Sequence, residues 1–202
     1  MSEEEDLKVI LLGESGVGKT NLINITMGQE FNEDEATTSN SSFSVKPLNL
    51  NGKEYEVKLW DTIGQEKLRH LTKLFYSDSK IVIFVYDISE RKTFEALKNY
   101  WVKDVHEKLG QDIIKGLVGN KIDKFIEEKV TQEEGEEYAK AIGARFILTS
   151  AKTEGPKKFE ELVTQLLEDY LKKIGKIKPN DDAGNSKIKI GPEAPPKKKR
   201  KC

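Results

Sequence analysis

The stretch Gly13-Glu14-Ser15-Gly16-Val17-Gly18-Lys19-Thr20 directly follows an apolar run over residues 7–12. It has the pattern G-x-x-x-x-G-K-[ST], in which glycines allow backbone N–H groups to curve around phosphate oxygens. Lys19 supplies a positive charge, the Thr20 hydroxyl is a ligand for Mg²⁺, and a helix beginning near Gly18 adds its positive dipole. The alternative is an ordinary glycine-rich turn between a strand and a helix. The apolar run favours the first interpretation, so we expect a nucleoside di- or triphosphate to bind here.

A second motif predicts the base. Asn120-Lys121-Ile122-Asp123 follows another apolar run, over residues 113–118. The Asp123 carboxylate can accept hydrogen bonds from the ring N–H and the exocyclic amine of guanine, whereas adenine lacks that amine and has no ring donor there. A site built around such a buried group rejects a base that leaves it unpaired by a factor of about 10⁴ to 10⁵. Alone, the motif also fits a charged turn in which Asn120 caps a helix; after a phosphate loop it predicts guanine.

Two more loops follow apolar stretches. Trp60-Asp61-Thr62-Ile63-Gly64-Gln65-Glu66 comes after residues 55–59, and Thr149-Ser150-Ala151-Lys152 comes after residues 146–148. Asp61 is placed to hold Mg²⁺ through a water, because this ion keeps several of its waters. Gly64 lets the backbone approach a γ-phosphate, and Gln65 is placed to orient the attacking water. The alternative for the first loop is an Asp-Thr turn at a strand end; the second is expected to close over the base with its backbone and Lys152.

With these four loops in order, the chain resembles the Ras-like small GTPases over residues 7–171, and within them the Rab branch. Tyr76, Ser15 and the stretch Phe84-Val85-Tyr86-Asp87-Ile88-Ser89 are suggestive of that branch. The resemblance implies an α/β fold of the P-loop NTPase class, a Ras-like G domain. Its sheet is expected to be six-stranded and mostly parallel, with one antiparallel edge strand and helices on both faces.

The resemblance also implies roles for individual residues. Phe31 is expected to stack near the guanine, with core anchoring as the alternative. Thr38 is expected to close on Mg²⁺ when the γ-phosphate is present, with its neighbour Thr37 as the rival. The expected catalytic residues are Gln65, Lys19 and Gly64, and the expected Mg²⁺ ligands are Thr20, Thr38 and Asp61. The residues expected to contact GTP or GDP are Gly13, Ser15, Gly16, Val17, Gly18, Lys19, Thr20, Asn21, Phe31, Thr38, Gly64, Asn120, Lys121, Asp123, Ser150, Ala151 and Lys152.

For function, the resemblance implies a monomeric GTP/GDP switch that hydrolyses GTP slowly to GDP and phosphate and regulates vesicle or membrane trafficking. Because the phosphate loop and the first switch contain no arginine, a GTPase-activating protein is expected to supply one, which is worth about 10³ to 10⁵ in rate. An exchange factor and effectors at the switch regions are the other expected partners. The alternatives are a scaffold that holds GTP with little hydrolysis and an ATP-using phosphate-loop enzyme.

Three positions depart from the Rab pattern. Residues 38–42 are small and polar before Phe43, which reduces apolar contact with effectors. Ile63 stands where the family usually has alanine, beside the γ-phosphate and the metal, and is expected to slow hydrolysis or speed nucleotide loss. Leu68 replaces an expected aromatic residue. We therefore expect a divergent partner surface on a conserved type of nucleotide site.

The 202-residue length predicts one domain with extensions. We expect an acidic N-terminal extension over residues 1–6, a G domain over 7–174 and a disordered, hypervariable tail over 175–202. A net charge of −1 argues against coating of nucleic acid. No apolar run is long enough to cross a bilayer, and no secretory signal begins the chain. A single cysteine suits the cytosol.

The tail ends in five cations over residues 197–201 followed by Cys202. One interpretation is geranylgeranylation of Cys202, with the cations adding about 1 kcal/mol each at an anionic leaflet. Prenylation machinery, GDP-dissociation inhibitor and the cytosolic face of an endomembrane would then be partners. However, Rab tails usually carry two such cysteines, and this terminus is not a C-a-a-X ending. The alternatives are a nuclear import signal, because a basic run follows proline, and a plain solvated tail.

Apolar strands and helical segments alternate along the chain, which favours a parallel α/β sheet covered on both faces. Asn51-Gly52 predicts a hairpin and therefore one antiparallel pair, and Pro47 places the first strand of that pair at the sheet edge. The loops that carry the motifs all follow strands, so we expect them to meet at one edge of the sheet. Expected strands cover residues 7–12, 43–50, 53–60, 80–86, 113–118 and 145–148; expected helices cover 19–27, 66–76, 92–109, 132–142 and 156–171.

Overall fold

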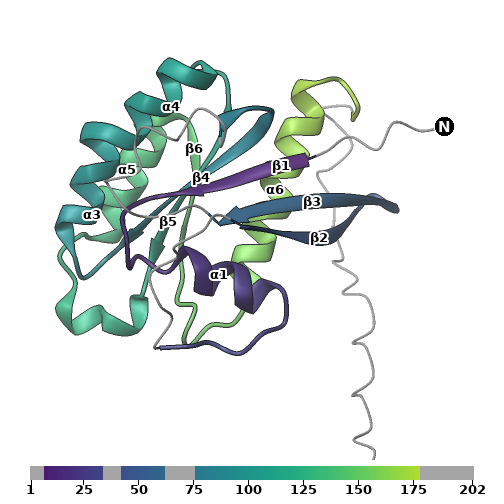
Figure 1. The fold of residues 1–202 in the computed structure, drawn as a ribbon. Coiled ribbons are helices and arrows are strands. Elements are labelled where there is room, and N and C mark those ends of the chain that lie inside the picture. Colours follow the sequence, from purple (N-terminus) through teal and green to yellow (C-terminus); the bar gives the residue numbers. More distant parts are fainter. Residues whose placement is uncertain (1–6, 34–41, 62–75, 178–202) are drawn as a thin grey trace, which may run out of the picture.

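The computed structural model describes residues 7–33, 42–61 and 76–177. Within them, six strands form one sheet in the order β2-β3-β1-β4-β5-β6, with helices on both faces (Figure 1). All pairs are parallel except β2 with β3. The strands are β1 (Leu7–Leu12), β2 (Ser42–Leu50), β3 (Lys53–Asp61), β4 (Ser79–Asp87), β5 (Ile114–Asn120) and β6 (Ala144–Leu148). The expected Ras-like sheet with one antiparallel edge strand is therefore confirmed.

The edge hairpin follows from its turn chemistry. Asn51 and Gly52 have φ of 53° and 80°, the left-handed conformations that a two-residue hairpin of this twist requires. Pro47 lies on β2, opposite Glu56, and β2 is at the edge of the sheet. Because Pro lacks an N–H, an edge position costs no ladder hydrogen bond on the side that faces away from β3.

Two hydrophobic cores lie on opposite faces of the sheet. On one face, α1 (Lys19–Thr26) and α6 (Lys157–Lys173) contribute side chains such as Leu22 and Phe159 to a core shared with β1 and β3. On the other face, α3 (Arg91–Ala96), α4 (Val102–Leu109) and α5 (Gln132–Ile142) cover β4 and β5. Strands β1 and β4 are buried along almost their whole length, as expected for the centre of a doubly covered sheet.

The helix predicted over residues 92–109 is present, with one irregularity. Between α3 and α4, Leu97–Trp101 forms a π-helical turn, η2. A 3₁₀ segment, η3 (Ile122–Glu127), follows β5 directly; the sequence analysis had not predicted it. Helix α5 begins at a capping box in which Thr131 accepts from the Glu134 N–H, the usual N-terminal signature. The helix expected over residues 66–76 falls almost wholly outside the described residues.

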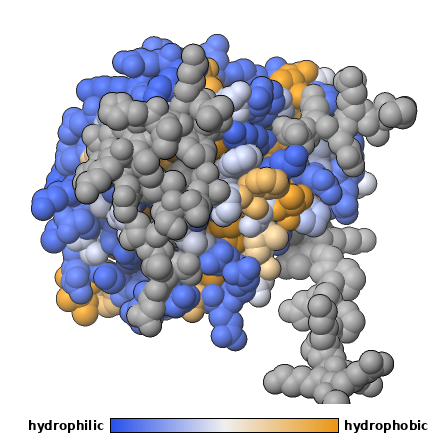
Figure 2. All heavy atoms as spheres, viewed as in Figure 1, coloured by the Kyte–Doolittle hydropathy of each residue, from blue (hydrophilic) through white to orange (hydrophobic). Residues whose placement is uncertain are grey.

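The surface agrees with the high content of charged residues. Figure 2 shows mostly hydrophilic side chains on the face in view, with separate small apolar areas. Among the described residues, the exposed large apolar side chains are Phe43, Phe125, Ile126 and Ile174. No helix in this part of the chain is long and apolar enough to span a membrane.

Candidate nucleotide site

The phosphate loop lies between β1 and α1, at the carboxyl end of the central strands. Two of its glycines are required by close packing. A Cβ on Gly13 would lie 2.2 Å from the Val85 carbonyl oxygen, and a Cβ on Gly18 would lie 2.4 Å from Asn120 Nδ2. Gly18 also has a φ of 95°, and Gly16 has a φ of 78° with open space around it, so these positions favour glycine through backbone conformation. Ser15 is exposed beside Gly16.

Lys19 is buried at the start of α1, with only 5% of its surface exposed. Its Nζ donates to the carbonyl oxygens of Gly13 (2.9 Å) and Glu14 (3.0 Å). Burial lowers the pKa of Lys19 to about 8, although the carboxylates of Asp61 and Glu14 partly oppose that shift. A buried cation is costly unless a negative group joins it, so the loop is suited to an anionic ligand.

Thr20 and Asp61 come from α1 and from the end of β3. The Thr20 hydroxyl donates to Asp61 Oδ2 at 2.7 Å, and Asp61 is buried. A hydroxyl and a carboxylate that touch beside a phosphate loop are the hard oxygen ligands that Mg²⁺ prefers. These two residues therefore fit that ion. The third expected ligand, Thr38, lies outside the described residues.

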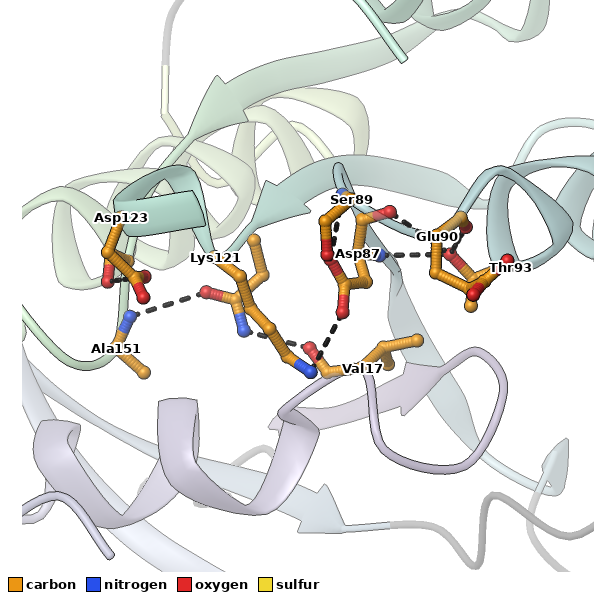
Figure 3. Close-up of polar contacts among 10 residues, drawn as sticks. Val17, Asp87, Ser89, Glu90, Thr93, Lys121, Asp123 and Ala151 are labelled. Carbon is orange, nitrogen blue, oxygen red and sulfur yellow. Dashed lines mark hydrogen bonds and ion pairs between the residues drawn. The ribbon is translucent and has the colours of Figure 1, made fainter. Parts of the chain in front are cut away.

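Asn120, at the end of β5, joins the phosphate loop to the loop after β6. Its Nδ2 donates to the Val17 carbonyl oxygen at 2.8 Å, and its Oδ1 accepts from the Ala151 N–H at 3.3 Å. Figure 3 shows these bonds spanning from the phosphate loop to Ala151. Asn120 is 1% exposed. Its side chain is thus engaged in holding three loops together.

Asp123 and Ser150 place a carboxylate where the sequence predicts base recognition. The Ser150 hydroxyl donates to Asp123 Oδ1 at 2.5 Å and accepts from the N–H groups of Lys152 (3.1 Å) and Thr153 (3.2 Å). This set fixes one carboxylate oxygen of Asp123. The hydroxyl that turns toward Asp123 is itself held by the backbone of the following loop.

Lys121 adopts a left-handed conformation, with φ of 68°, and its Nζ pairs with Asp87 Oδ2 at 2.8 Å. Asp87 also accepts from the N–H (2.8 Å) and hydroxyl (2.7 Å) of Ser89, as Figure 3 shows. Burial alone would raise the pKa of Asp87, but the hydrogen bonds from Lys121 and Ser89 outweigh burial and hold the pKa below its usual value. The sequence analysis used Asp87 and Ser89 only as a mark of the branch. The signal for their role was a pair of polar residues at the end of a buried strand.

The segment that carries Phe31 is held by Asn21. Asn21 Nδ2 donates to the Asn32 carbonyl oxygen, and the Asn32 N–H donates back to Asn21 Oδ1. Phe31 is partly buried against the core of α1 and α6, and Lys152 Nζ lies 5.9 Å from its ring centre. Phe31 therefore has the core contact that was the alternative, and it also lies beside a residue expected to cover the base.

Several expected positions lie outside the described residues: Thr37, Thr38, Ile63, Gly64, Gln65, Leu68 and the tail with residues 197–201 and Cys202. Their roles stay predictions, as do the domain boundaries. Among the described residues, contacts join Lys19 to Gly13, Thr20 to Asp61, Asn120 to Val17 and Ala151, Asp123 to Ser150, and Lys152 to Phe31. Asn21 instead turns its side chain to Asn32, and Lys121 turns its amine to Asp87.

Comparison with known proteins agrees with this geometry. The Ras family model matches residues 8–172. Human Ras-related protein Rab-21 is 43% identical over 159 residues, which cover 79% of this chain and 69% of that protein. The Ras-related protein RABC1 of Arabidopsis thaliana is 41% identical over 164 residues (80% and 77%), and Rab-21 of Geodia cydonium is 37% identical over 172 (85% and 72%). The chain therefore belongs to the Ras family of small GTPases, within its Rab branch. Proteins of this family bind GTP or GDP with Mg²⁺.

Proposed function

We propose that the chain is a switch that binds GTP and GDP and hydrolyses GTP. The observation that carries this proposal is the union of four chain segments at one edge of the sheet: the phosphate loop, the end of β3 with Asp61, the start of η3 with Asp123, and the loop after β6 with Ser150. A phosphate-binding loop and a carboxylate suited to guanine are held to each other through Asn120. Family membership supports the same function.

In this proposal, each residue of the site has its own role in binding or hydrolysing the nucleotide. The backbone N–H groups of the phosphate loop and Lys19 bind the β- and γ-phosphates and stabilise negative charge there, since fixed donors in a site closed to water act strongly. Thr20 and Asp61 would hold Mg²⁺, which supplies positive charge to the phosphate oxygens. We assign Gln65 to orienting the water and Gly64 to approaching the γ-phosphate. Asp123 accepts from the guanine, while Ser150, Ala151 and Lys152 close the base site.

The proposed readout is contact with effectors in the GTP state, in membrane trafficking on a cytosolic membrane surface. Phe43 is 49% exposed and stacks on Trp60, with ring centres 4.9 Å apart. An exposed aromatic ring that stacks on a partly buried one, on the two strands of the edge hairpin, is suited to a protein partner, because aromatic side chains are enriched at interfaces. Exchange and activating factors belong to the same proposal.

Membrane attachment through the tail is proposed from its sequence, since five cations precede Cys202. Replacing residues 197–201 with alanine is expected to weaken binding of the lipidated protein to anionic vesicles by about 1 kcal/mol per charge removed near the surface. Unchanged binding would count against this anchor.

Single-turnover GTP hydrolysis with Mg²⁺ tests the enzymatic part. The natural protein is expected to hydrolyse GTP slowly, and Gln65→Leu is expected to abolish that hydrolysis because the water is no longer oriented. Ile63→Ala serves as the second variant. If the natural protein binds GTP and only Ile63→Ala hydrolyses it, the chain is a GTP-holding scaffold and the switch proposal is wrong.

A further inference from the structure

A buried tryptophan reaches the phosphate loop from a distant helix. Trp101 is 3% exposed, and its Nε1–H donates to Glu14 Oε1 at 2.9 Å across 87 positions of sequence. Glu14 is the second residue of the phosphate loop, and its own carbonyl oxygen accepts from Lys19 Nζ. The indole, Glu14 and Lys19 are therefore joined in a chain of hydrogen bonds that ends at the cation expected to bind phosphate.

The backbone around Trp101 is unusual. Trp101 is the last residue of the π-helical turn η2, which interrupts the helix between α3 and α4. A π turn takes one more residue than an α turn, is rare, and is frequent at functional sites. The extra residue rotates the side chains that follow the π turn by about 100° relative to those that precede it. Here Leu97, at the start of the turn, packs in the core. Trp101, at its end, places its indole N–H against Glu14 of the phosphate loop.

The same helix is fixed at a second point. Three residues beyond Trp101, Asp104 accepts from the Tyr76 hydroxyl at 2.6 Å and pairs with Lys108 at 2.6 Å. Tyr76 is buried, and its burial and its contact with Asp104 raise the pKa of its hydroxyl, which keeps it a donor. Residues 101 and 104 share one helix face. The helix is thereby fixed to the phosphate loop through Trp101 and to the segment just before β4 through Tyr76. This second contact helps to hold Trp101 in place against Glu14.

We propose that Trp101 is a positioning residue for the phosphate loop, acting through Glu14 to slow the release of bound nucleotide. The proposal rests on the proposed binding of guanine nucleotide. The indole holds the Glu14 side chain, and Glu14 in turn presents its carbonyl oxygen to Lys19. Without this hydrogen bond the loop has more conformations open to it, and only a fraction of them present the donors to phosphate. The affinity for nucleotide falls in proportion to the fraction of loop conformations that can bind phosphate.

The test is the rate at which a directly excited fluorescent GDP analogue leaves the full-length protein with Mg²⁺. Trp101→Phe keeps an aromatic ring and removes the N–H; we expect release about tenfold faster, the usual order for losing a hydrogen bond to a charged group. Tyr55→Phe is the matched control, because it too keeps an aromatic ring and removes one polar group, and Tyr55 lies near the start of β3, at the opposite end of that strand from Asp61. Its release rate is expected to stay within about twofold of the natural protein.

Glu14 variants separate positioning from packing. Glu14→Gln and Glu14→Ala both remove the charge beside Lys19, and only Glu14→Gln keeps an acceptor oxygen for the indole N–H. Glu14→Ala is therefore expected to release nucleotide about tenfold faster than Glu14→Gln. Because both act on one hydrogen bond, the double variant Glu14→Ala with Trp101→Phe is expected to be no faster than Glu14→Ala alone. Glu14 is only half-buried, so its variants remain informative if Trp101→Phe folds poorly.

Equal release rates in Glu14→Ala and Glu14→Gln, or additive effects in the double variant, would overturn the positioning role. Failure of the natural protein to bind the GDP analogue would instead overturn the proposed function, so the two failures are distinguishable.

Discussion

At the scale of single residues, Lys19 has the most distinctive electrostatics of the site. Burial lowers its pKa to about 8, against a value near 10.4 in water. A lysine with a lowered pKa is fully charged below that pKa and loses its proton as the pH rises through it. Because a phosphate beside the ammonium favours the charged form, we expect the pKa of Lys19 to rise when nucleotide binds.

We therefore expect GDP binding to take up few protons at pH 7 and more at pH 8.5, with affinity falling as the pH rises through about 8. Calorimetry in two buffers of different ionisation enthalpy measures this uptake. Lys115→Met is the control: Lys115 is buried too and its pKa is lowered by burial, but it lies at the opposite end of β5 from Asn120. Equal proton uptake at the two pH values in the natural protein would contradict the role of Lys19.

At the scale of residues, the sequence predicts most where one short stretch carries the whole motif. Gly13, Gly18 and Lys19 were expected from their spacing, and the structure gives each a tight environment. The contacts of Glu14 with Trp101 and of Lys121 with Asp87 were not predicted. Each joins chain segments that no local pattern relates, so only the folded sheet brings them together.

At the scale of elements, strands were predicted well because buried parallel strands are continuous apolar runs, and the hairpin because Asn51-Gly52 specifies its turn. The sequence analysis missed η3, whose Phe125 and Ile126 are exposed and give no amphipathic period. It also missed the π turn η2, because a single extra residue hardly changes the apolar spacing of the helix.

The link between β4 and the segment after β5 gives an element-scale prediction. Asp87→Ala removes the acceptor of Lys121 and Ser89, so we expect the free energy of unfolding to fall by about 1–3 kcal/mol and GDP affinity to fall as well. This is less than for a fully buried pair, because the Lys121 side chain is 28% exposed. Urea unfolding and GDP titration measure the two effects.

Glu95→Gln is the control for that prediction. It breaks the exposed pair of Arg91 and Glu95, 3.7 Å apart, and is expected to change the unfolding free energy by less than about 0.5 kcal/mol.

Because the pKa of Asp87 is held below its usual value, the contribution of Asp87 to the free energy of unfolding is present above about pH 4. That contribution is lost as the pH falls through the folded-state pKa. Equal stability of Asp87→Ala and the natural protein at neutral pH would contradict the role of this link.

At the scale of the whole molecule, the sheet brings its four site segments to one edge, where the strands end. Ligands of such sheets bind beyond the carboxyl ends of the strands, so motif loops that follow strands predict the place of the site. The two cores on either face hold β1, β4 and β5 rigid beneath it. No comparable rule predicts which proteins bind this chain, because that depends on surface side chains and on segments outside the described residues.

The measurement that tests guanine recognition most directly is competition of GDP, ADP and xanthosine diphosphate for the natural protein and for Asp123→Asn. The natural protein is expected to prefer GDP over ADP by about 10⁴ to 10⁵. Asp123→Asn is expected to prefer the xanthine nucleotide, whose 2-position oxygen accepts from the new amide while Ser150 still bonds the side-chain oxygen. Asp112→Asn, far from the site segments, is the control and should keep the natural preference. Equal binding of GDP and ADP by the natural protein, or an unchanged guanine preference in Asp123→Asn, would contradict a guanine site at Asp123.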